Sequence, residues 1–353
     1  MIKRLLYLIL IFTVLSCKDR KTLSEQKDLL LGDWVRISYQ ENQMSPFGMQ
    51  VGFNFLSDDT YEDKLGFFNF DREYIKYDGN LGKYQIIGDT IKMSVAGKWY
   101  SRTVYKLTKD TLIFGTKNDN VIFLKKEYDT IDVPEFDEIV VSSYANGNIL
   151  LSKNENVYFS KPDNDKVHYK ASISQKDFGR IVTQFKKADY INLKSNYIAS
   201  SSEDKICAVT FLKNKKNLNS ITFYGSSASP EFKSAYTQLM YMPQTLSIVP
   251  DSVPKYLDLK SLEFKNDNTR LELNSSEVYY LLNLIKNGKE SRYHFKEEYN
   301  LTSKNEYVNK ITTDGRYYKF YLKDNSTKVI DIEMNFLEGN NFSNTFEKMN
   351  NTI

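Results

Sequence analysis

The sequence predicts a mainly β protein with α+β parts: a small antiparallel β-barrel followed by one or two α+β modules. Short β-type runs separated by turn signals fill residues 28–129, and amphipathic helical patterns begin only after residue 170. An acidic linker that contains Pro134 separates the two regions. Many short strands at close spacing are typical of a sandwich or a barrel, and closure into a barrel removes exposed strand edges.

The chain begins with a segment typical of a secretory signal. Lys3 and Arg4 precede eleven uncharged, mostly apolar residues, Leu5 to Leu15. This run is shorter than the roughly 20 residues that cross a bilayer, and it has the length of a signal-peptide apolar region. We therefore predict a signal peptide at residues 1–16 and a polar tether at residues 17–27.

The end of this segment, Val14-Leu15-Ser16-Cys17, resembles the lipobox of bacterial lipoproteins, with Val14 where Leu is usual. The resemblance implies cleavage before Cys17 and acylation of that cysteine, and two or more acyl chains anchor a protein stably. It places the protein in the cell envelope as an outer membrane lipoprotein. Lys18-Asp19 partly matches the surface-export tag of some Bacteroidota lipoproteins, which leaves the surface and periplasmic faces open. The alternatives are an unmodified cysteine after a cleaved signal and an uncleaved anchor helix.

The composition is that of a globular protein, with 41% hydrophobic and 26% charged residues. The formal net charge is only +3, and no basic block occurs. A near-neutral chain of this kind is a poor nucleic-acid binder, so we expect no nucleic-acid partner. If Cys17 carries lipid, Cys207 is the only other cysteine and no intramolecular disulfide forms.

The predicted barrel, residues 28–129, opens with Gly32-Asp33-Trp34 and continues as a meander of short strands. Gly32 and Trp34 resemble the Gly-x-Trp motif of lipocalins, and the meander is similar to the lipocalin-like domains of Bacteroidota lipoproteins. The resemblance implies that Trp34 plugs the closed end of the barrel. Lipocalins usually set an arginine over this tryptophan, where the present sequence offers Lys125 and Lys126.

Aromatic residues crowd the predicted barrel, and two interpretations of them stay open. In the first, an aromatic cup holds a small apolar ligand, with four residues as its candidate lining: Phe53, Phe55, Trp99 and Tyr105. In the second, the rings fill a narrow barrel as an ordinary core, which we favour.

Two α+β modules are predicted at residues 137–250 and 255–353. Each combines strands with helices whose starts carry cap signals: Ser174 with Asp177, Ser229 with Pro230, and Ser275-Ser276-Glu277. The order of strands and helices indicates α+β. The first module resembles a domain of unknown function common in Bacteroidota lipoproteins, but Ser142–Ala145 stands where that family often has paired cysteines. No thiol or metal role is carried over, and whether the modules are repeats stays open.

No catalytic motif is recognisable, and we predict no enzyme, cofactor or metal. The two histidines, His168 and His294, lie in different predicted modules, and Asp163-Asn164-Asp165 lacks the distal ligands of a calcium loop. We expect a lipid-anchored envelope protein with a binding or scaffolding role, whose partners are the membrane and an unidentified envelope protein or small apolar ligand. The alternatives are a lipocalin-type carrier and an envelope hydrolase that uses scattered carboxylates.

Overall fold

The computed structural model describes residues 22–37, 51–69, 75–116, 119–129, 132–143, 147–161, 167–197, 206–224, 228–303 and 305–349. Cys17 and the predicted signal peptide lie outside the described residues. The chain divides into two compact units. Of the described residues, the first unit takes in 22–37, 51–69 and those from 78 to 127, and the second takes in 75–77 and those from 128 to 349.

A short helix, α2 (Leu23–Leu30), precedes the barrel strands. Its N-cap residue Thr22 accepts a hydrogen bond from the Glu25 amide at 3.2 Å, and the Glu25 carboxylate accepts one from the Thr22 amide at 2.7 Å. This reciprocal capping box starts the helix, and the buried Leu30 joins it to the barrel core. Residues 23–27, assigned to the tether from sequence, are therefore helical.

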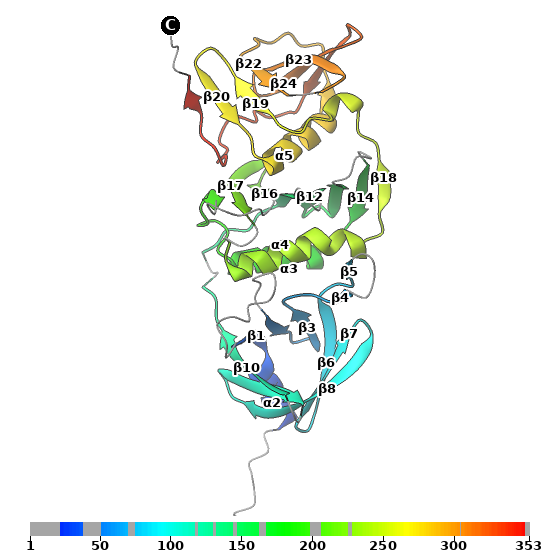
Figure 1. Cartoon of the computed structure of the whole chain (residues 1–353), viewed down its shortest axis with the longest axis vertical. Coiled ribbons are helices and arrows are strands. Elements are labelled where there is room, and N and C mark those ends of the chain that lie inside the picture. The colour runs from blue at the N-terminus through cyan, green and yellow to red at the C-terminus, as the bar shows by residue number, and fades with distance from the viewer. Residues whose placement is uncertain are drawn as a thin grey trace, which may run out of the picture. The chain divides into compact units, whose positions relative to one another are not determined.

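The first unit is a closed antiparallel barrel, which confirms the predicted class (Figure 1). Neighbouring strands follow the order β1-β10-β9-β8-β7-β6-β3-β2. Their bounds are β1 (Gly32–Arg36), β2 (Gly52–Phe55), β3 (Thr60–Asp63), β6 (Leu81–Ile87), β7 (Thr90–Val95), β8 (Lys98–Leu107), β9 (Thr111–Thr116) and β10 (Asp119–Lys126). Two short strands, β4 (Phe68–Asn69) and β5 (Lys76–Tyr77), lie outside this ladder.

The second unit contains a first sheet with the order β15-β17-β16-β11-β12-β13-β14-β18. Its strands are β11 (Glu138–Ser143), β12 (Gly147–Ser152), β13 (Asn156–Ser160), β14 (His168–Ser172), β15 (Asn196–Tyr197), β16 (Ile206–Lys213), β17 (Lys216–Tyr224) and β18 (Val249–Asp251). Helices α3 (Gln175–Lys187) and α4 (Pro230–Tyr241) cover one face, and η1 (Met242–Thr245) follows α4 (Figure 1).

Both predicted helix starts of this part are confirmed. The Ser174 hydroxyl accepts a hydrogen bond from the Asp177 amide at 3.1 Å at the start of α3. At the start of α4, the Ser229 hydroxyl accepts one from the Phe232 amide at 3.3 Å, with Pro230 in the first turn. These caps satisfy amides that have no partner within the helix.

The second sheet follows the order β21-β25-β24-β23-β22-β19-β20-β26. Its elements are η2 (Lys255–Leu257), β19 (Glu263–Lys265), β20 (Thr269–Glu272), α5 (Ser275–Lys286), β21 (Lys289–Glu290), β22 (Tyr299–Thr302), β23 (Val308–Thr313), β24 (Tyr317–Leu322), β25 (Thr327–Asp331) and β26 (Glu347–Lys348). The helix α5 carries a full capping box, made by Asn274 and Glu277.

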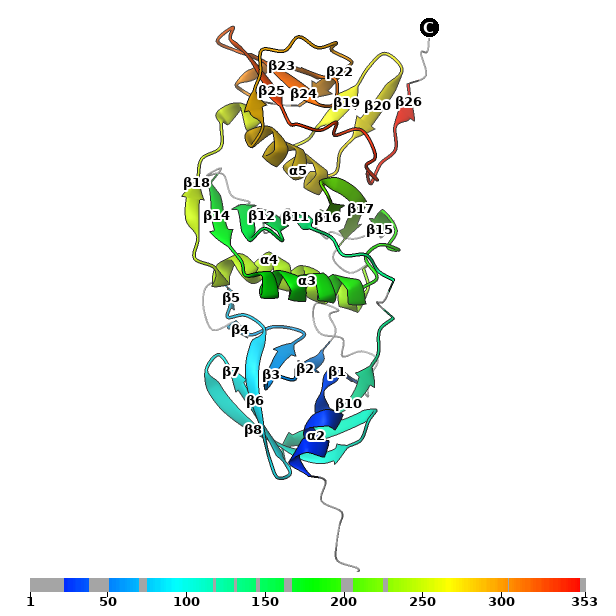
Figure 2. The same ribbon diagram turned by 180° about the vertical axis from the view of Figure 1, so that it is seen from behind.

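Helix α5 lies between the two sheets (Figure 2). Strand side chains alternate between faces, so Ile139 and Val141 pack toward α3 and α4 while Val140 packs toward α5. Leu150 and Leu212 join Val140 in the core that α5 and the second sheet complete. The regions assigned to two modules from sequence therefore share one hydrophobic core.

Among the described helices, none has the length and apolar character needed to cross a membrane.

Candidate functional site

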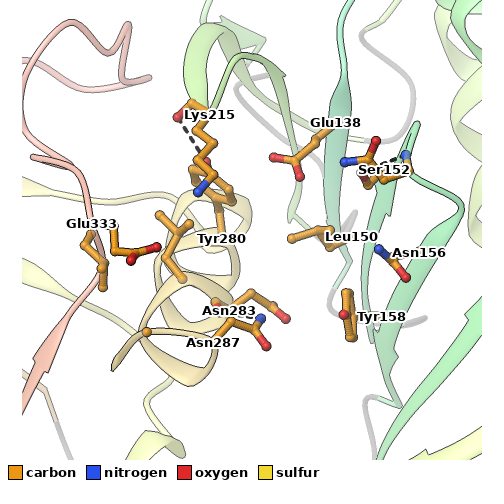
Figure 3. Close-up of a pocket in the computed structure, with 14 residues that line it drawn as sticks. Glu138, Leu150, Ser152, Asn156, Tyr158, Lys215, Tyr280, Asn283, Asn287 and Glu333 are labelled. Carbon is orange, nitrogen blue, oxygen red and sulfur yellow. Dashed lines mark hydrogen bonds between the residues drawn. The ribbon is translucent and has the colours of Figure 1, made fainter. Parts of the chain in front are cut away.

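A cavity of about 210 Å³ opens in the second unit between the first sheet and α5 (Figure 3). Strands β11, β12 and β13 supply one wall, and the turn after β16 adds Lys215. Helix α5 and the segment after β25 supply the opposite wall. The cavity thus joins residues that lie far apart in the sequence, and none of them was singled out from sequence.

Strand register explains why the sheet wall is polar at this end. Glu138 pairs with Ser152, and Leu150 pairs with both Val140 and Tyr158, so these side chains share the α5 face. Val140 and Leu150 are buried near α5, whereas Glu138 and Ser152 stand at the end of the same rows. Polar side chains are tolerated at Glu138 and Ser152 because the apolar contact between the sheet and α5 does not extend to them.

Glu138 is the most unusual group in the cavity. Its carboxylate is partly buried, and among the described residues no hydrogen bond or ion pair is made to it. Burial raises the pKa of Glu138, the nearby charge of Lys215 opposes this rise, and Asp137 adds to it. Because none of these bonds is made to it, this partly buried carboxylate can accept a hydrogen bond from an external donor.

The helix wall presents amide side chains. The Asn283 amide nitrogen donates to the Tyr279 carbonyl at 2.9 Å, and the Asn287 amide nitrogen donates to the Asn283 carbonyl at 2.8 Å. Each bond uses one of the two N–H groups of its amide and leaves the second N–H and the amide oxygen outside that bond. Tyr280 fixes the neighbouring turn, because its hydroxyl donates to the Lys215 carbonyl at 3.0 Å (Figure 3).

A second carboxylate, Glu333, reaches the cavity from the segment after β25. It forms an ion pair with Lys289, and that contact holds the pKa of Glu333 below its usual range. The pKa values of Glu138 and Glu333 are therefore shifted in opposite directions, although both residues line one cavity. Among the described residues that line it, there is no histidine or cysteine.

The sequence-predicted plug, Trp34, is fully buried in the barrel core. Its indole Nε1 donates to the Leu30 carbonyl at 2.6 Å, and the Lys125 ammonium lies 5.3 Å from the ring centroid. The sequence offered two lysines for the position over Trp34, Lys125 and Lys126. In the structure Lys125 lies there. Gly32 has a φ of +109°, and a Cβ there would lie 3.0 Å from Lys125 Cε. A side chain at Gly32 would therefore strain the backbone and displace the lysine.

The four candidate ligand-lining residues separate into two pairs. Phe53 and Phe55 lie together in the barrel interior, with ring centroids 6.0 Å apart. Trp99 and Tyr105 are 47% and 48% exposed, which does not fit a lining role. Trp99 lies near the tip of the β7–β8 hairpin, beyond the packed interior. Tyr105 lies in an irregularity between Val104 and Lys106, where a bulge turns it away from the ladder.

The barrel interior around Phe53 is filled by packed rings. Phe114 and Phe123 stack with centroids 5.1 Å apart, and Phe55 meets Tyr84 edge-on at 5.1 Å. Phe53 contacts Phe114 and Phe123 at 5.8 and 5.5 Å. This arrangement favours a filled core over an aromatic cup.

Among the described residues, no group of three or more His, Cys, Asp or Glu side chains could hold a metal ion. Cys207 is buried, and its sulfur lies 4.0 Å from the Ser143 hydroxyl.

Residues 138–243 match a family described as a domain of unknown function, DUF6438. The match covers the first sheet from β11 to β17 together with α3 and α4. It includes the sheet wall of the cavity and ends before α5. No curated protein and no solved structure matches the chain.

Proposed function

We propose that this chain is a non-catalytic binding protein of the bacterial cell envelope, held on the outer membrane by acyl chains on Cys17. The observation that carries the location is the apolar run that ends at Val14-Leu15-Ser16-Cys17 and turns charged at Lys18. One acyl chain binds a membrane marginally, whereas two or more hold it stably. The membrane is therefore the first partner, and the folded units work beside it.

The cavity between the first sheet and α5 supports the binding role. It has amide acceptors at Asn283 and Asn287, and a carboxylate at Glu138 to which no described residue makes a hydrogen bond. Converging polar groups that line a concave space are a feature of ligand sites. The filled barrel interior supports a scaffolding role for the first unit and weighs against a lipocalin-type carrier.

A hydrolase is the second candidate, because one observation favours it. Glu138 and Glu333 line the same cavity and have pKa values shifted apart, as acid and base carboxylates do in glycosidases. Against it, Glu333 is held in an ion pair with Lys289, and in the described part of the chain no hydrogen bond orients Glu138. Release of nitrophenol from p-nitrophenyl glycosides by the wild type, lost in Glu138→Gln, would establish the hydrolase instead.

Cys17→Ser tests the membrane anchor. We expect this change to abolish labelling by a clickable palmitate analogue in bacterial cells and to move the protein from the membrane to the soluble fraction. The matched control is Cys207→Ser, which alters the buried cysteine and leaves Cys17 in place. Membrane partition that is the same for Cys17→Ser and the wild type would contradict the proposed anchor.

A further inference from the structure

We infer that the cavity between β11–β13 and α5 binds one uncharged, hydroxyl-rich sugar ring, of pyranose size. This inference rests on the proposed binding function and names the ligand class for that site. Three observations support it: the hydrogen-bonding groups that face the cavity, the balance of charge around them, and the size and apolar contacts of the space.

Acceptors face the cavity from both walls, beside groups that can donate, such as the Lys215 ammonium and the Tyr158 hydroxyl. The Glu138 carboxylate has no partner among the described residues, and the Asn283 and Asn287 amide oxygens are left over after their nitrogens bond to the backbone. Figure 3 shows Glu138 on the sheet side of the space and the two asparagines on the α5 side. A ligand that meets these walls needs groups that both donate and accept on its edges, which a ring of hydroxyl groups provides.

The charges around the cavity balance, which favours an uncharged ligand. Lys215 lies close enough to Glu138 to oppose the rise in its pKa, and Glu333 is paired with Lys289. Lys286 lies 5.3 Å from the centroid of the Tyr158 ring, and its charge is matched by Asp251. An amine would leave the charge of Lys215 without compensation, and an acid would be repelled by Glu138. A charge left without a partner in a partly buried site is expensive.

The space also has the two-sided character of a sugar. Leu150 gives it an apolar contact on the sheet wall, and Leu284 and Ile332 give it apolar contacts on the opposite wall. Asn154 and Asn156 give it a polar rim on the sheet side. A pyranose has C–H groups on its faces and hydroxyls on its edge, so it matches both. The volume of about 210 Å³ lies below the range of sites for drug-sized ligands, which limits the ligand to one small ring.

Binding is tested on the full chain in detergent micelles by saturation-transfer NMR and isothermal titration calorimetry. The probes are methyl glucopyranoside, methyl galactopyranoside and methyl N-acetylglucosaminide, with putrescine and glucuronate as charged comparisons. We expect at least one neutral glycoside to bind with a millimolar dissociation constant, and both charged probes to bind at least tenfold more weakly. Dextran is added as a probe to distinguish a free sugar from the end of a glycan. Binding of dextran that is tighter than that of the methyl glycosides indicates a chain end. Equal or weaker binding indicates a free sugar.

Two variants connect the binding to the cavity. Glu138→Gln should weaken the neutral glycoside about tenfold, the size of one charge-assisted hydrogen bond. Asn156→Trp places a bulky ring at the exposed rim and should abolish binding, which keeps the test informative if Glu138→Gln does not fold. The matched control is Glu272→Gln, an exposed glutamate of β20 that does not line the cavity, and its affinity should equal that of the wild type.

The inference is overturned if no neutral glycoside binds, or if Glu138→Gln and Asn156→Trp both leave the affinity unchanged. Putrescine binding that Glu138→Gln removes would also overturn it, because the ligand class would then be an amine, although the proposed binding function would stand. The anchor is measured separately through Cys17→Ser, so failure of the sugar can be told apart from failure of the envelope location.

Discussion

Replacing Trp34 by alanine should destabilise the barrel by about 3–5 kcal/mol, the usual cost of removing a large, fully buried aromatic side chain. Trp34 is 0% exposed and is part of the barrel core. Its loss leaves a cavity, removes the donor to the Leu30 carbonyl and takes the ring from beneath Lys125. The barrel is a small unit, so this cost is a large fraction of the stability of an ordinary domain.

The matched control for this change is Trp99→Ala. Trp99 is 47% exposed at the β7–β8 hairpin, so its loss should cost less than about 1 kcal/mol. The chain has only two tryptophans, both in the first unit. Each variant therefore keeps one tryptophan whose fluorescence follows urea unfolding of the barrel alone. Equal midpoints for the two variants would show that Trp34 does not stabilise the barrel.

Replacing Trp34 by phenylalanine separates packing from hydrogen bonding. Phenylalanine keeps an aromatic ring in the core but cannot donate to the Leu30 carbonyl, which is satisfied by Trp34 at 2.6 Å. We expect an intermediate loss, since an unsatisfied buried carbonyl costs about 1–3 kcal/mol. This change also tests whether α2, which ends at Leu30, is held on the barrel through the indole.

Local signals predicted the fold well because their physical causes are local. The cap residues Ser174 and Ser229 lie within three residues of the amides they satisfy. Gly32 and Trp34 lie in one strand, so the start of the barrel could also be read from the sequence. The helix α2 was missed, although Thr22 and Glu25 have capping-box spacing, because the segment is short and polar.

The candidate site could not be predicted from the sequence because its residues meet only through contacts between distant parts of the chain. Glu138 on β11 and Asn283 on α5 meet only after the first sheet buries Val140 and Leu150 against that helix. The one local signal was a charged residue at the head of the apolar run Glu138–Val141, and such residues are common at strand ends. Trp99 and Tyr105 were candidates for a ligand lining, but the structure leaves both side chains exposed. An aromatic residue in a strand was expected to face inward, but a hairpin tip and a bulge turn these two outward.

The second large effect is expected at Glu277, a buried carboxylate at the N-terminus of α5. It is 1% exposed, and it accepts hydrogen bonds from the Asn274 amide at 2.8 Å and the Ser343 amide at 2.7 Å. It thereby joins the start of the helix to the segment between β25 and β26. Nearby, the Ser276 hydroxyl lies 2.8 Å from that of Thr210 on β16, so the same end of α5 is fixed to the first sheet.

Glu277→Ala should therefore destabilise the second unit by on the order of 3 kcal/mol, because two buried amides lose their acceptor and the helix loses its capping box. The loss is measured by urea unfolding followed by circular dichroism, and by hydrogen exchange of residues 274–286. Glu272→Ala is the control, since this exposed glutamate of the neighbouring strand should change stability by less than about 0.5 kcal/mol. Equal exchange of α5 in the two variants would contradict the role given to Glu277.

The pH dependence of Glu277→Gln tests the same group in a second way. Burial raises the pKa of Glu277 above its usual value of 4.5, and hydrogen bonds from Ser343 and Asn274 oppose the rise only in part. A carboxyl group whose pKa is raised by folding binds its proton more tightly in the folded state. Its contribution to stability is complete below pH 4.5 and is lost as the pH rises through the raised pKa. Glutamine does not titrate, so the free-energy cost of Glu277→Gln should be greatest in acid and should shrink toward neutral pH. A cost that grew with pH would show instead that the carboxylate is stabilised in its charged form, and that its hydrogen bonds outweigh its burial.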